Sequence, residues 1–500
     1  MAIKDGKILE LGPEREILNR YDCDQVIDAG MKPVYPGFHD AHCHFWAYAQ
    51  TLIEVDLTGS SSYHEVINKL VEYDQKNNPD WITGRGWDQT LWQGQQFPTK
   101  DTLDILFPDK PVLIRRIDGH AALANSKALE IAGITEDTVI AGGEIQKING
   151  KTTGILLDNA FDAVARFVPE SSPETKLKYL QEAEYNLFEQ GLTSLNDAGV
   201  NSPDRELFVN WYEQGLLTIR NYCMLMPDSG NIRFASENKV LETGHLLIRS
   251  FKLVADGAMG SHGACLLQPY SDSAGIYGML LSTPENFREI AELAAEIGYQ
   301  INTHAIGDSA NRVMLNIYAD IIGDIPDHRW KIEHAQLLSP DDFHFFRDLH
   351  VIPSVQPTHC TSDMRWAEKH VGADRILFAY AWQKLLEQSG ILALGTDFPI
   401  ENISPLETFY AAITRQDKQG NPTGGFYPDQ ALTREQALLG MTRWAAYSNF
   451  EDNKKGSLEA GKYADFIILT KDIMTIPPAE ILNTFVEKTF LGGVEVFSAE

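Results

Sequence analysis

Two histidines separated by one residue, His42 and His44, follow an apolar segment that contains a Pro-Gly step. In a β-strand, side chains at positions i and i+2 point to the same face. If residues 34–44 form a strand, both imidazoles converge on one point at its C-terminal end, which suits a divalent metal ion. A His-x-His pair is common by itself, so this hypothesis depends on which side chains end the other strands.

The chain contains eight apolar segments that each end in polar residues or glycine, and most are separated by helix-like stretches such as 285–297 and 311–322. The segments are 34–44, 192–198, 218–225, 248–257, 298–306, 329–336, 350–357 and 391–397. Eight alternating strand and helix units are typical of a (β/α)₈ TIM-like barrel, an α/β fold. We therefore predict such a barrel as the centre of the molecule.

The domain organisation follows from where this alternation is interrupted. We assign residues 34–449 to the barrel, and within it residues 45–191 are far too many for one helical crossover. That segment is expected to form an inserted subdomain that faces the substrate. Short strand-like segments at both ends, 1–33 and 450–500, predict a small β-sandwich domain built by both termini.

Chemistry in a TIM-like barrel takes place at the C-terminal ends of the strands. Five of the eight predicted strands end in side chains that bind metals or transfer protons: His42, His44, Lys252, His304, His334 and Asp397. Each has a structural alternative, since a histidine can be a hydrogen-bonded strand end, Asp397 a turn cap and Lys252 the partner of Asp256. All six alternatives holding together would be a poor coincidence, so we interpret the residues as one site.

Nine short motifs occur in order and at wide spacing along nearly the whole chain. They lie at 36–44, 84–88, 118–122, 153–156, 255–258, 304–308, 332–336, 356–359 and 395–397. Together they resemble the amidohydrolase superfamily, in the amidohydrolase family 3 branch that includes N-substituted formamide deformylase and uncharacterised metal-dependent hydrolases.

The resemblance implies a role for each residue of the predicted site. It implies that His42 and His44 bind the more buried metal, that His304 and His334 hold a second metal, and that Asp397 contacts the first metal and the bridging hydroxide. Lys252 would be carboxylated and bridge two metals, because a protonated ammonium has no lone pair to donate. If Lys252 is not carboxylated, a one-metal site is the alternative. Zinc is the divalent metal we expect.

The predicted mechanism uses this metal to make hydroxide available at neutral pH. Asp397 is expected to accept a proton as hydroxide attacks and to pass it to the leaving nitrogen. We expect His120 to be a second catalytic residue, in contact with the carbonyl oxygen or oxyanion, with a purely structural histidine as the alternative. Further predicted substrate contacts are Trp87, Trp92, Asp88, Arg116 and His359.

The sequence departs from the family pattern at three places. The family usually begins with another strand before the segment at residues 3–12, so we expect a truncated start and an incomplete terminal domain. Asn196 stands where the family often has histidine, which removes any role of that histidine. His262 stands where the family commonly has arginine, and we expect a changed loop contact there.

Composition limits the partners and the compartment. The chain has 42 Lys and Arg against 70 Asp and Glu, a net charge of −28. So acidic a chain should repel nucleic acids and anionic membranes, which leaves a small-molecule substrate as the expected partner. A homodimer is compatible with the large barrel exterior. The five cysteines include no C-x-x-C pair, and the chain has no apolar segment of membrane-spanning length and no signal-peptide core, so a cytoplasmic location is expected.

The function predicted from the sequence is a metal-dependent hydrolase of a non-peptide C–N bond, of the amide or N-formyl type, that acts through metal-activated hydroxide. Two alternatives stay open. One is an ester or lactone hydrolase that uses the same site, since one barrel supports several leaving groups. The other is a non-catalytic metal-binding scaffold relative. The presence of four histidines and one aspartate at strand ends favours an enzyme over the scaffold.

Overall fold

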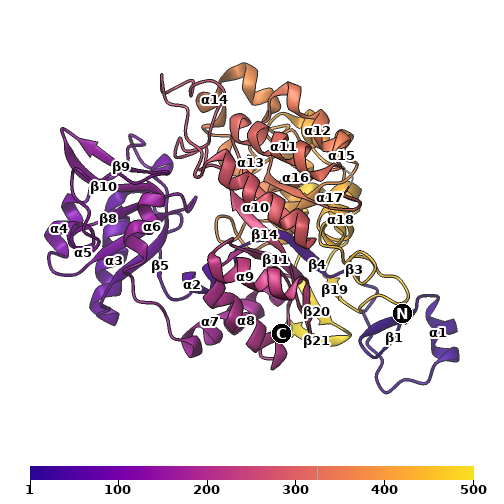
Figure 1. Cartoon of the computed structure of the whole chain (residues 1–500). Helices are drawn as coiled ribbons and strands as arrows, with labels where there is room; N and C mark the ends of the chain where they lie inside the picture. Colours follow the sequence, from indigo (N-terminus) through magenta and orange to yellow (C-terminus); the bar gives the residue numbers. More distant parts are fainter. Residues whose placement is uncertain (324, 500) are drawn as a thin grey trace.

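The computed structural model describes residues 1–323 and 325–499. Its centre is a ring of eight parallel strands, each hydrogen-bonded to the next in sequence order (Figure 1). They are β4 (Phe38–Cys43), β11 (Leu192–Val200), β12 (Arg220–Leu225), β14 (Leu246–Val254), β15 (Gln300–Ala305), β16 (Lys331–His334), β17 (Ile352–Val355) and β18 (Ala393–Leu394). The short strand β13 (Leu241–Thr243) pairs antiparallel with β14 on the outside. The predicted TIM-like barrel is confirmed.

The barrel closes between its last and first strands through backbone contacts beyond β18. The Asp397 N–H donates to the carbonyl of His42 at 2.7 Å, and the His44 N–H donates to the carbonyl of Phe398 at 2.8 Å. The Asp40 carboxylate in β4 also accepts a hydrogen bond from the Thr396 hydroxyl at 2.7 Å. These contacts hold Asp397 beside the histidine pair.

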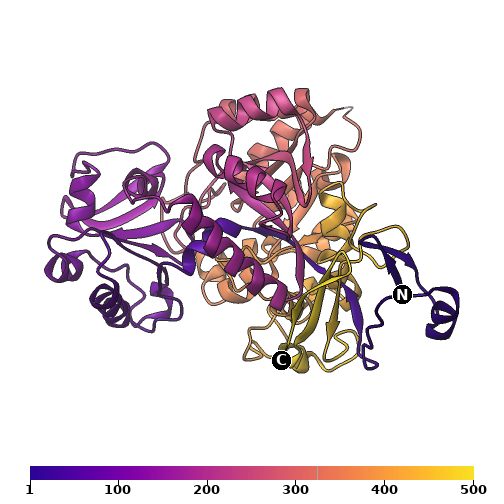
Figure 2. The same cartoon turned by 90° about the horizontal axis from the view of Figure 1, so that it is seen from below.

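Helices cover the outside of the barrel (Figures 1 and 2). They include α7 (Pro173–Glu189), α8 (Ser202–Glu213), α9 (Ser229–Asn238), α10 (Pro284–Ile297), α11 (Asp308–Ile322), α12 (His344–Asp348), α13 (Pro357–Asp363), α14 (Ala367–Arg375), α15 (Trp382–Ser389), α16 (Pro405–Thr414), α17 (Arg434–Gly440) and α18 (Arg443–Ser448). Helix α10 shows why they form. Its buried side chains recur every three or four positions, at Phe287, Ile290, Ala291 and Ala294. The Thr283 side chain caps its first turn, and Gly298 ends it in a left-handed conformation.

A separate unit lies between β4 and β11, at the left of Figure 1. Its sheet has the order β5 (Val55–Asp56), β6 (Ile82–Trp87), β7 (Val112–Arg116), β8 (Ala121–Ala124), β10 (Lys151–Asp158) and β9 (Gly143–Ile148). The helices of this stretch are α2 (Phe45–Thr51), α3 (Tyr63–Asn77), α4 (Asp101–Leu106), α5 (Ser126–Ile131) and α6 (Asn159–Ala165). The unit has hydrophobic clusters of its own, distinct from the barrel core.

Both ends of the chain contribute to one further sheet. It has the order β21 (Val494–Ser498), β20 (Val486–Leu491), β19 (Phe466–Leu469) and β3 (Val34–Pro36). The strands β1 (Ala2–Lys4) and β2 (Lys7–Glu10) form a separate hairpin, followed by α1 (Glu14–Arg20). A sandwich of two facing sheets stays a prediction. Among residues 1–323 and 325–499, every helix is too short or too polar to cross a lipid bilayer.

The prediction of one strand over 34–44 is wrong. The segment forms two strands that meet at Gly37: β3 pairs with β19 in the terminal sheet, and β4 belongs to the barrel. A side chain does not fit at this junction, because a Cβ at Gly37 would lie 2.2 Å from the Thr193 Oγ1. Both halves are extended, and the sequence alone does not reveal that they belong to different sheets.

A buried ion pair joins the barrel to the terminal sheet. Arg220, at the start of β12, donates from Nε and Nη2 to the two carboxylate oxygens of Asp465 at 2.6 and 3.0 Å. Its guanidinium also lies 3.7 Å from the centre of the Tyr463 ring. Both charged side chains are almost fully buried, so if one is removed, water cannot take its place beside the other.

We therefore expect Arg220→Met to lower the free energy of unfolding by about 3–5 kcal/mol, because it leaves the Asp465 carboxylate buried without a counter-charge. Arg288→Met is the matched control, since the Arg288–Asp320 pair is largely exposed and should contribute about 0–1 kcal/mol. Urea denaturation of both variants checks the difference. Equal losses in the two variants would contradict the structural role of the buried pair.

Candidate metal centre and catalytic site

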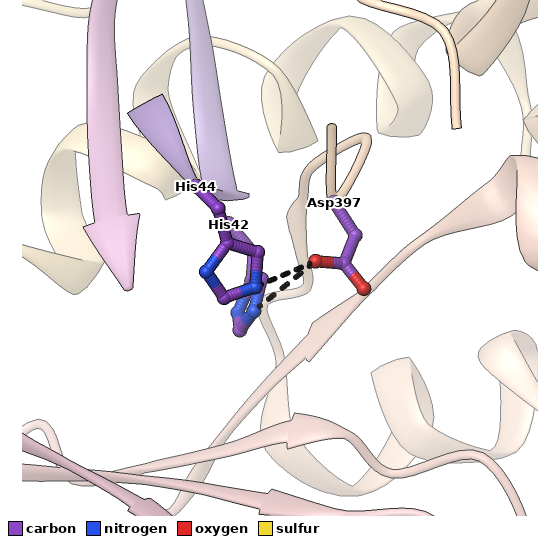
Figure 3. Close-up of side chains that lie close together, drawn as sticks. All are labelled: His42, His44 and Asp397. Carbon is purple, nitrogen blue, oxygen red and sulfur yellow. Dashed lines mark ion pairs between the residues drawn. The ribbon is translucent and has the colours of Figure 1, made fainter. Parts of the chain in front are cut away.

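The three side chains at the seam of the barrel converge as the sequence predicts. His42 and His44, at the end of β4, direct their Nε2 atoms to the Asp397 carboxylate (Figure 3). The distances to Asp397 Oδ1 are 3.6 Å from His42 and 3.2 Å from His44. A possible ligand atom of each of the three residues lies within 4.8 Å of the others, so one ion could contact all three.

The other predicted ligands lie around this group. The Lys252 Nζ is 3.0 Å from the His42 Nε2. The His334 ring centre lies 4.9 Å from that of His42 and 4.6 Å from that of His304. The structure thus brings together His42, His44, Lys252, His304, His334 and Asp397, which come from five different strand ends. Lys252 is not paired with Asp256, whose carboxylate accepts backbone N–H groups of Cys265, Ile306 and Gly307.

Acceptors on the far side of three imidazoles fix which nitrogen faces the site. His42 donates from Nδ1 to the Glu333 carboxylate at 2.6 Å, and His44 donates from Nδ1 to the Ala198 carbonyl at 2.7 Å. His334 donates from Nδ1 to the Gln356 side-chain oxygen at 2.7 Å. The Nε2 lone pair of each ring is therefore left for the site, an arrangement that holds metal-binding histidines in position.

Burial keeps His42, His304 and His334 neutral at physiological pH. It lowers the pKa of His42 to about 4, with the nearby Lys252 adding to the effect. It also holds the pKa of His304 and of His334 well below the usual value. For Glu333, burial alone would raise the pKa, but the close electrostatic contact and hydrogen bond with His42, together with the charge of Lys331, lower the pKa to about 2. A carboxylate thus faces neutral imidazoles, which are the forms that bind metals.

Two of the predicted ligands occupy the left-handed backbone region, with φ of +72° at His334 and +63° at Asp397. Such a conformation costs a non-glycine residue roughly 1–2 kcal/mol and concentrates at functional sites. At His334 it has a visible consequence. Adjacent strand residues normally point to opposite faces, yet both Glu333 and His334 contact His42.

The donor set fits a divalent metal. It combines neutral imidazole nitrogens with one carboxylate, the ligand types that zinc prefers. The buried atoms of the site that have no hydrogen-bond partner among the described residues include Asp397 Oδ1, His304 Nε2 and His359 Nε2. Buried polar atoms are seldom left without a partner unless an ion, water or ligand supplies one.

The site opens into a cavity of about 1060 Å³. Its lining includes His44, Lys252, His304, His334, His359 and Asp397 from the barrel, and Arg85, Asp88, Arg115, Arg116 and His120 from the inserted unit. His359 lies with its Nε2 3.5 Å from Asp397 Oδ2. His120 donates from Nδ1 to Asp158 at 2.8 Å, and its ring centre is 5.3 Å from that of His304. The inserted unit therefore forms one side of the cavity.

The structure contradicts the prediction that Trp87 and Trp92 are walls of the pocket. Both are buried in the core of the inserted unit, where their rings lie 6.0 Å apart, and neither lines the cavity. The indole N–H of Trp87 donates to the Ile114 carbonyl. The reason is a break in the pairing of β6 with β7 between Arg85 and Trp87, at Gly86, where φ is +106°. It disrupts the alternation that would otherwise place Arg85 and Trp87 on one face.

Comparison with known proteins agrees with this geometry. The model of the amidohydrolase family matches residues 25–497. This protein belongs to the amidohydrolase family. It is 32% identical to the protein LONG AFTER FAR-RED 3 of Arabidopsis thaliana, over 99% of this chain and 88% of that one. It is 25% identical to N-substituted formamide deformylase of Arthrobacter pascens, over 99% and 94%. The crystal structure of an uncharacterized metal-dependent hydrolase from Pyrococcus horikoshii OT3 superposes with a TM-score of 0.77 at 29% identity, over 95% and 94%.

In this amidohydrolase, the two residues noted as departures lie outside the cavity lining. Asn196 donates to the Ala41 carbonyl at 2.8 Å and contacts His39 Nε2 at 2.8 Å, so it ties β11 to β4 below the site. His262 contacts Asp272 at 3.1 Å, and its ring centre lies 4.4 Å from that of His370. Asn196 thus has a structural contact, and His262 belongs to a second His–Asp–His group.

Sequence reasoning missed the residues that position the ligands of this amidohydrolase, chiefly Glu333 and Gln356. Glu333 directly precedes His334, and a charged residue inside an apolar strand was a signal that could have been read. Gln356 gave no such signal, because its partner, His334, comes from the neighbouring strand.

We expect Glu333→Gln to weaken zinc binding by about 10- to 100-fold, because the amide no longer provides the carboxylate that orients His42. Competition with a coloured chelator measures the affinity. Glu296→Gln is the matched control, since Glu296 is exposed on α10. Unchanged zinc affinity in Glu333→Gln, with native circular dichroism, would show that this carboxylate does not support the metal site.

Proposed function

We propose that this protein is a metal-dependent hydrolase of a non-peptide C–N bond, of the amide or N-formyl type. The observation that carries the proposal is the convergence of His44, Asp397, Lys252, His304 and His334 on one cavity, with His42 buried directly beside them. The bond type is supported by the relative named N-substituted formamide deformylase, which matches along nearly its whole length.

The residues that would hold the metal divide into two groups. His42, His44 and Asp397 would hold one ion, and His304, His334 and a carboxylated Lys252 would hold a second. When bound, a divalent ion such as zinc supplies hydroxide at neutral pH and polarises a carbonyl oxygen. Burial lowers the pKa of Lys252, which favours the free amine that carboxylation requires. Without that modification, we expect one ion.

Asp397 is the residue we assign to proton transfer. Burial alone would raise its pKa, but the electrostatic effect of the adjacent His42 and His44 imidazoles outweighs it and holds the pKa well below the usual value. The carboxylate is therefore ionised at neutral pH and can accept a proton as the nucleophile forms. It would return that proton to the leaving nitrogen, because an amine leaves poorly unless it is protonated.

His120, which lines the cavity from the inserted unit, is suited to contact the substrate carbonyl. Burial alone would lower its pKa, but the hydrogen bond and charge of Asp158 outweigh it and raise the pKa. The raised pKa favours an imidazolium, whose Nδ1 donates to Asp158. The remaining N–H can then donate to an oxygen that becomes negative during the reaction.

The test is Asp397→Asn in zinc-supplemented protein, assayed against a panel of N-formyl and N-acyl amines and amino acids. We expect turnover to fall by about 10²- to 10⁴-fold, because the proton acceptor is lost, while most of the zinc is retained. Asp137→Asn, at an exposed loop position, is the control that should leave turnover unchanged. Undiminished turnover in Asp397→Asn would refute its role. Hydrolysis of esters or lactones alone would refute the proposed bond type.

A second variant tests His120. We expect His120→Phe to lower kcat by about 10²- to 10³-fold, as does loss of one oxyanion donor in other enzymes, with a smaller change in KM. Steady-state kinetics with the best substrate of the panel measures both constants. A raised KM at constant kcat would show instead that His120 only binds the substrate.

A further inference from the structure

Two arginines of the inserted unit, Arg85 and Arg115, line the cavity side by side. They are register partners on the parallel strands β6 and β7, so their side chains leave the same face of the sheet. Both belong to the lining of the cavity that holds Asp397 and His304. Neither forms a salt bridge within residues 1–323 and 325–499, in contrast to their neighbour Arg116.

Arg85 is a buried cation without a counter-ion. Only 6% of the residue surface is exposed. Its Nη2 donates to the Ile117 carbonyl at 3.0 Å, and its Nε has no hydrogen-bond partner among the described residues. Burial lowers the pKa of Arg85 to about 10, and the charge of Arg115 contributes to this. The guanidinium therefore stays charged at neutral pH.

Arg115 does not relieve this charge but adds to it. Its guanidinium lies 4.3 Å from the centre of the Phe161 ring. This contact is with an aromatic ring and not with an anion, so it does not neutralise the charge of Arg115. Two neighbouring carboxylates, Asp56 and Asp118, accept hydrogen bonds from other groups and form no salt bridge with either arginine among the described residues. Asp56, the register partner of Arg85 on β5, accepts from the Thr58 N–H at 2.9 Å. Asp118 accepts from Arg116 at 2.6 Å.

Glu54 and Asp162 also act on the pair, but only through longer-range charge. Asp397 and Glu54 stabilise the charged form of Arg85, and Glu54 and Asp162 do so for Arg115. Within the part of the chain that the structure describes, these carboxylates act on the two guanidinium groups through longer-range charge and not through an ion pair. The two positive charges thus remain uncompensated at short range.

Arg116, which the sequence singled out as a substrate contact, differs in this respect. Its Nη2 donates to Asp88 at 2.8 Å, its Nη1 to Asp118 at 2.6 Å and its Nε to Gln89 at 2.7 Å. All three nitrogens of its guanidinium are engaged within the protein. Arg116 therefore supports the cavity wall, and the free positive charge of this wall lies at Arg85 and Arg115.

A buried charge beside a second like charge, with no anion near either, is costly, and the cost is removed when a ligand supplies the negative charge. Guanidinium groups present paired donors that match a carboxylate. We propose that Arg85 and Arg115 form a subsite for a carboxylate of the substrate. This inference rests on the proposed function: the preferred substrates are N-formyl or N-acyl compounds that carry a carboxylate, such as N-acylated amino acids.

Binding to the zinc-loaded full chain tests the subsite without turnover. The probes are N-methanesulfonylglycine and its carboxamide, which lack a hydrolysable acyl group and differ only in the charged group. Isothermal titration calorimetry should show that the carboxylate binds at least about 10-fold more tightly, as expected for a charge-assisted hydrogen bond. This preference should disappear in Arg85→Gln and in Arg115→Gln.

Arg166→Gln is the matched control, because Arg166 lies in the same unit but does not line the cavity. It should keep the preference of the unchanged protein. Arg85→Gln should keep or raise the melting temperature, because it removes an unpaired buried charge. A carboxylate preference that persists in both cavity variants would overturn the proposal and assign the preference to the metal. Equal binding of the two probes to the unchanged protein would overturn it as well.

Turnover separates this proposal from the proposed function. The two substrates are N-formylglycine and N-formylglycinamide. If the protein hydrolyses both with equal kcat/KM, the hydrolase function stands and the carboxylate subsite is refuted. If the probes show the arginine-dependent preference but no N-acyl or N-formyl compound is hydrolysed, the subsite stands and the C–N hydrolase function is refuted.

Discussion

The seam that closes the barrel is the constraint on which the rest of this structure depends. Two backbone hydrogen bonds join the end of β4 to the segment after β18, from Asp397 to His42 and from His44 to Phe398. They connect residues more than 350 positions apart in sequence. The same residues provide the imidazoles and the carboxylate of the candidate metal centre. The contacts that close the barrel therefore also bring the predicted metal ligands together.

Around this seam, the protein fixes the protonation of its ligands rather than only their positions. A carboxylate, a carbonyl and an amide each accept the Nδ1 proton of one histidine, while burial keeps His42 and His334 neutral. The strained backbone at His334 and Asp397 is held by the same surroundings. The inserted unit then adds a second kind of chemistry, because it brings positive charge to a cavity whose floor is built of neutral histidines and carboxylates.

Much of this arrangement could be predicted from the sequence, and the failures have physical reasons. The eight barrel strands and the convergence of their terminal residues follow from periodicity and from the rule that parallel strands end at one face. Trp87 could not be placed, because a single break in pairing at Gly86 reverses the expected face. The change of sheet at Gly37 could not be predicted, since it depends on pairing with strands that are distant in sequence. Glu333 and Arg85 act through contacts that only the folded chain creates.

The central claim is that His42, His44 and Asp397 bind a metal ion. Anomalous diffraction at the zinc absorption edge, from crystals of zinc-supplemented protein, tests it most directly. We expect a peak at about 2.0–2.2 Å from His42 Nε2, His44 Nε2 and a carboxylate oxygen of Asp397. The absence of a peak there would contradict metal binding by His42, His44 and Asp397. A peak found only at the separate cluster of His262, Asp272 and His370 would contradict it as well.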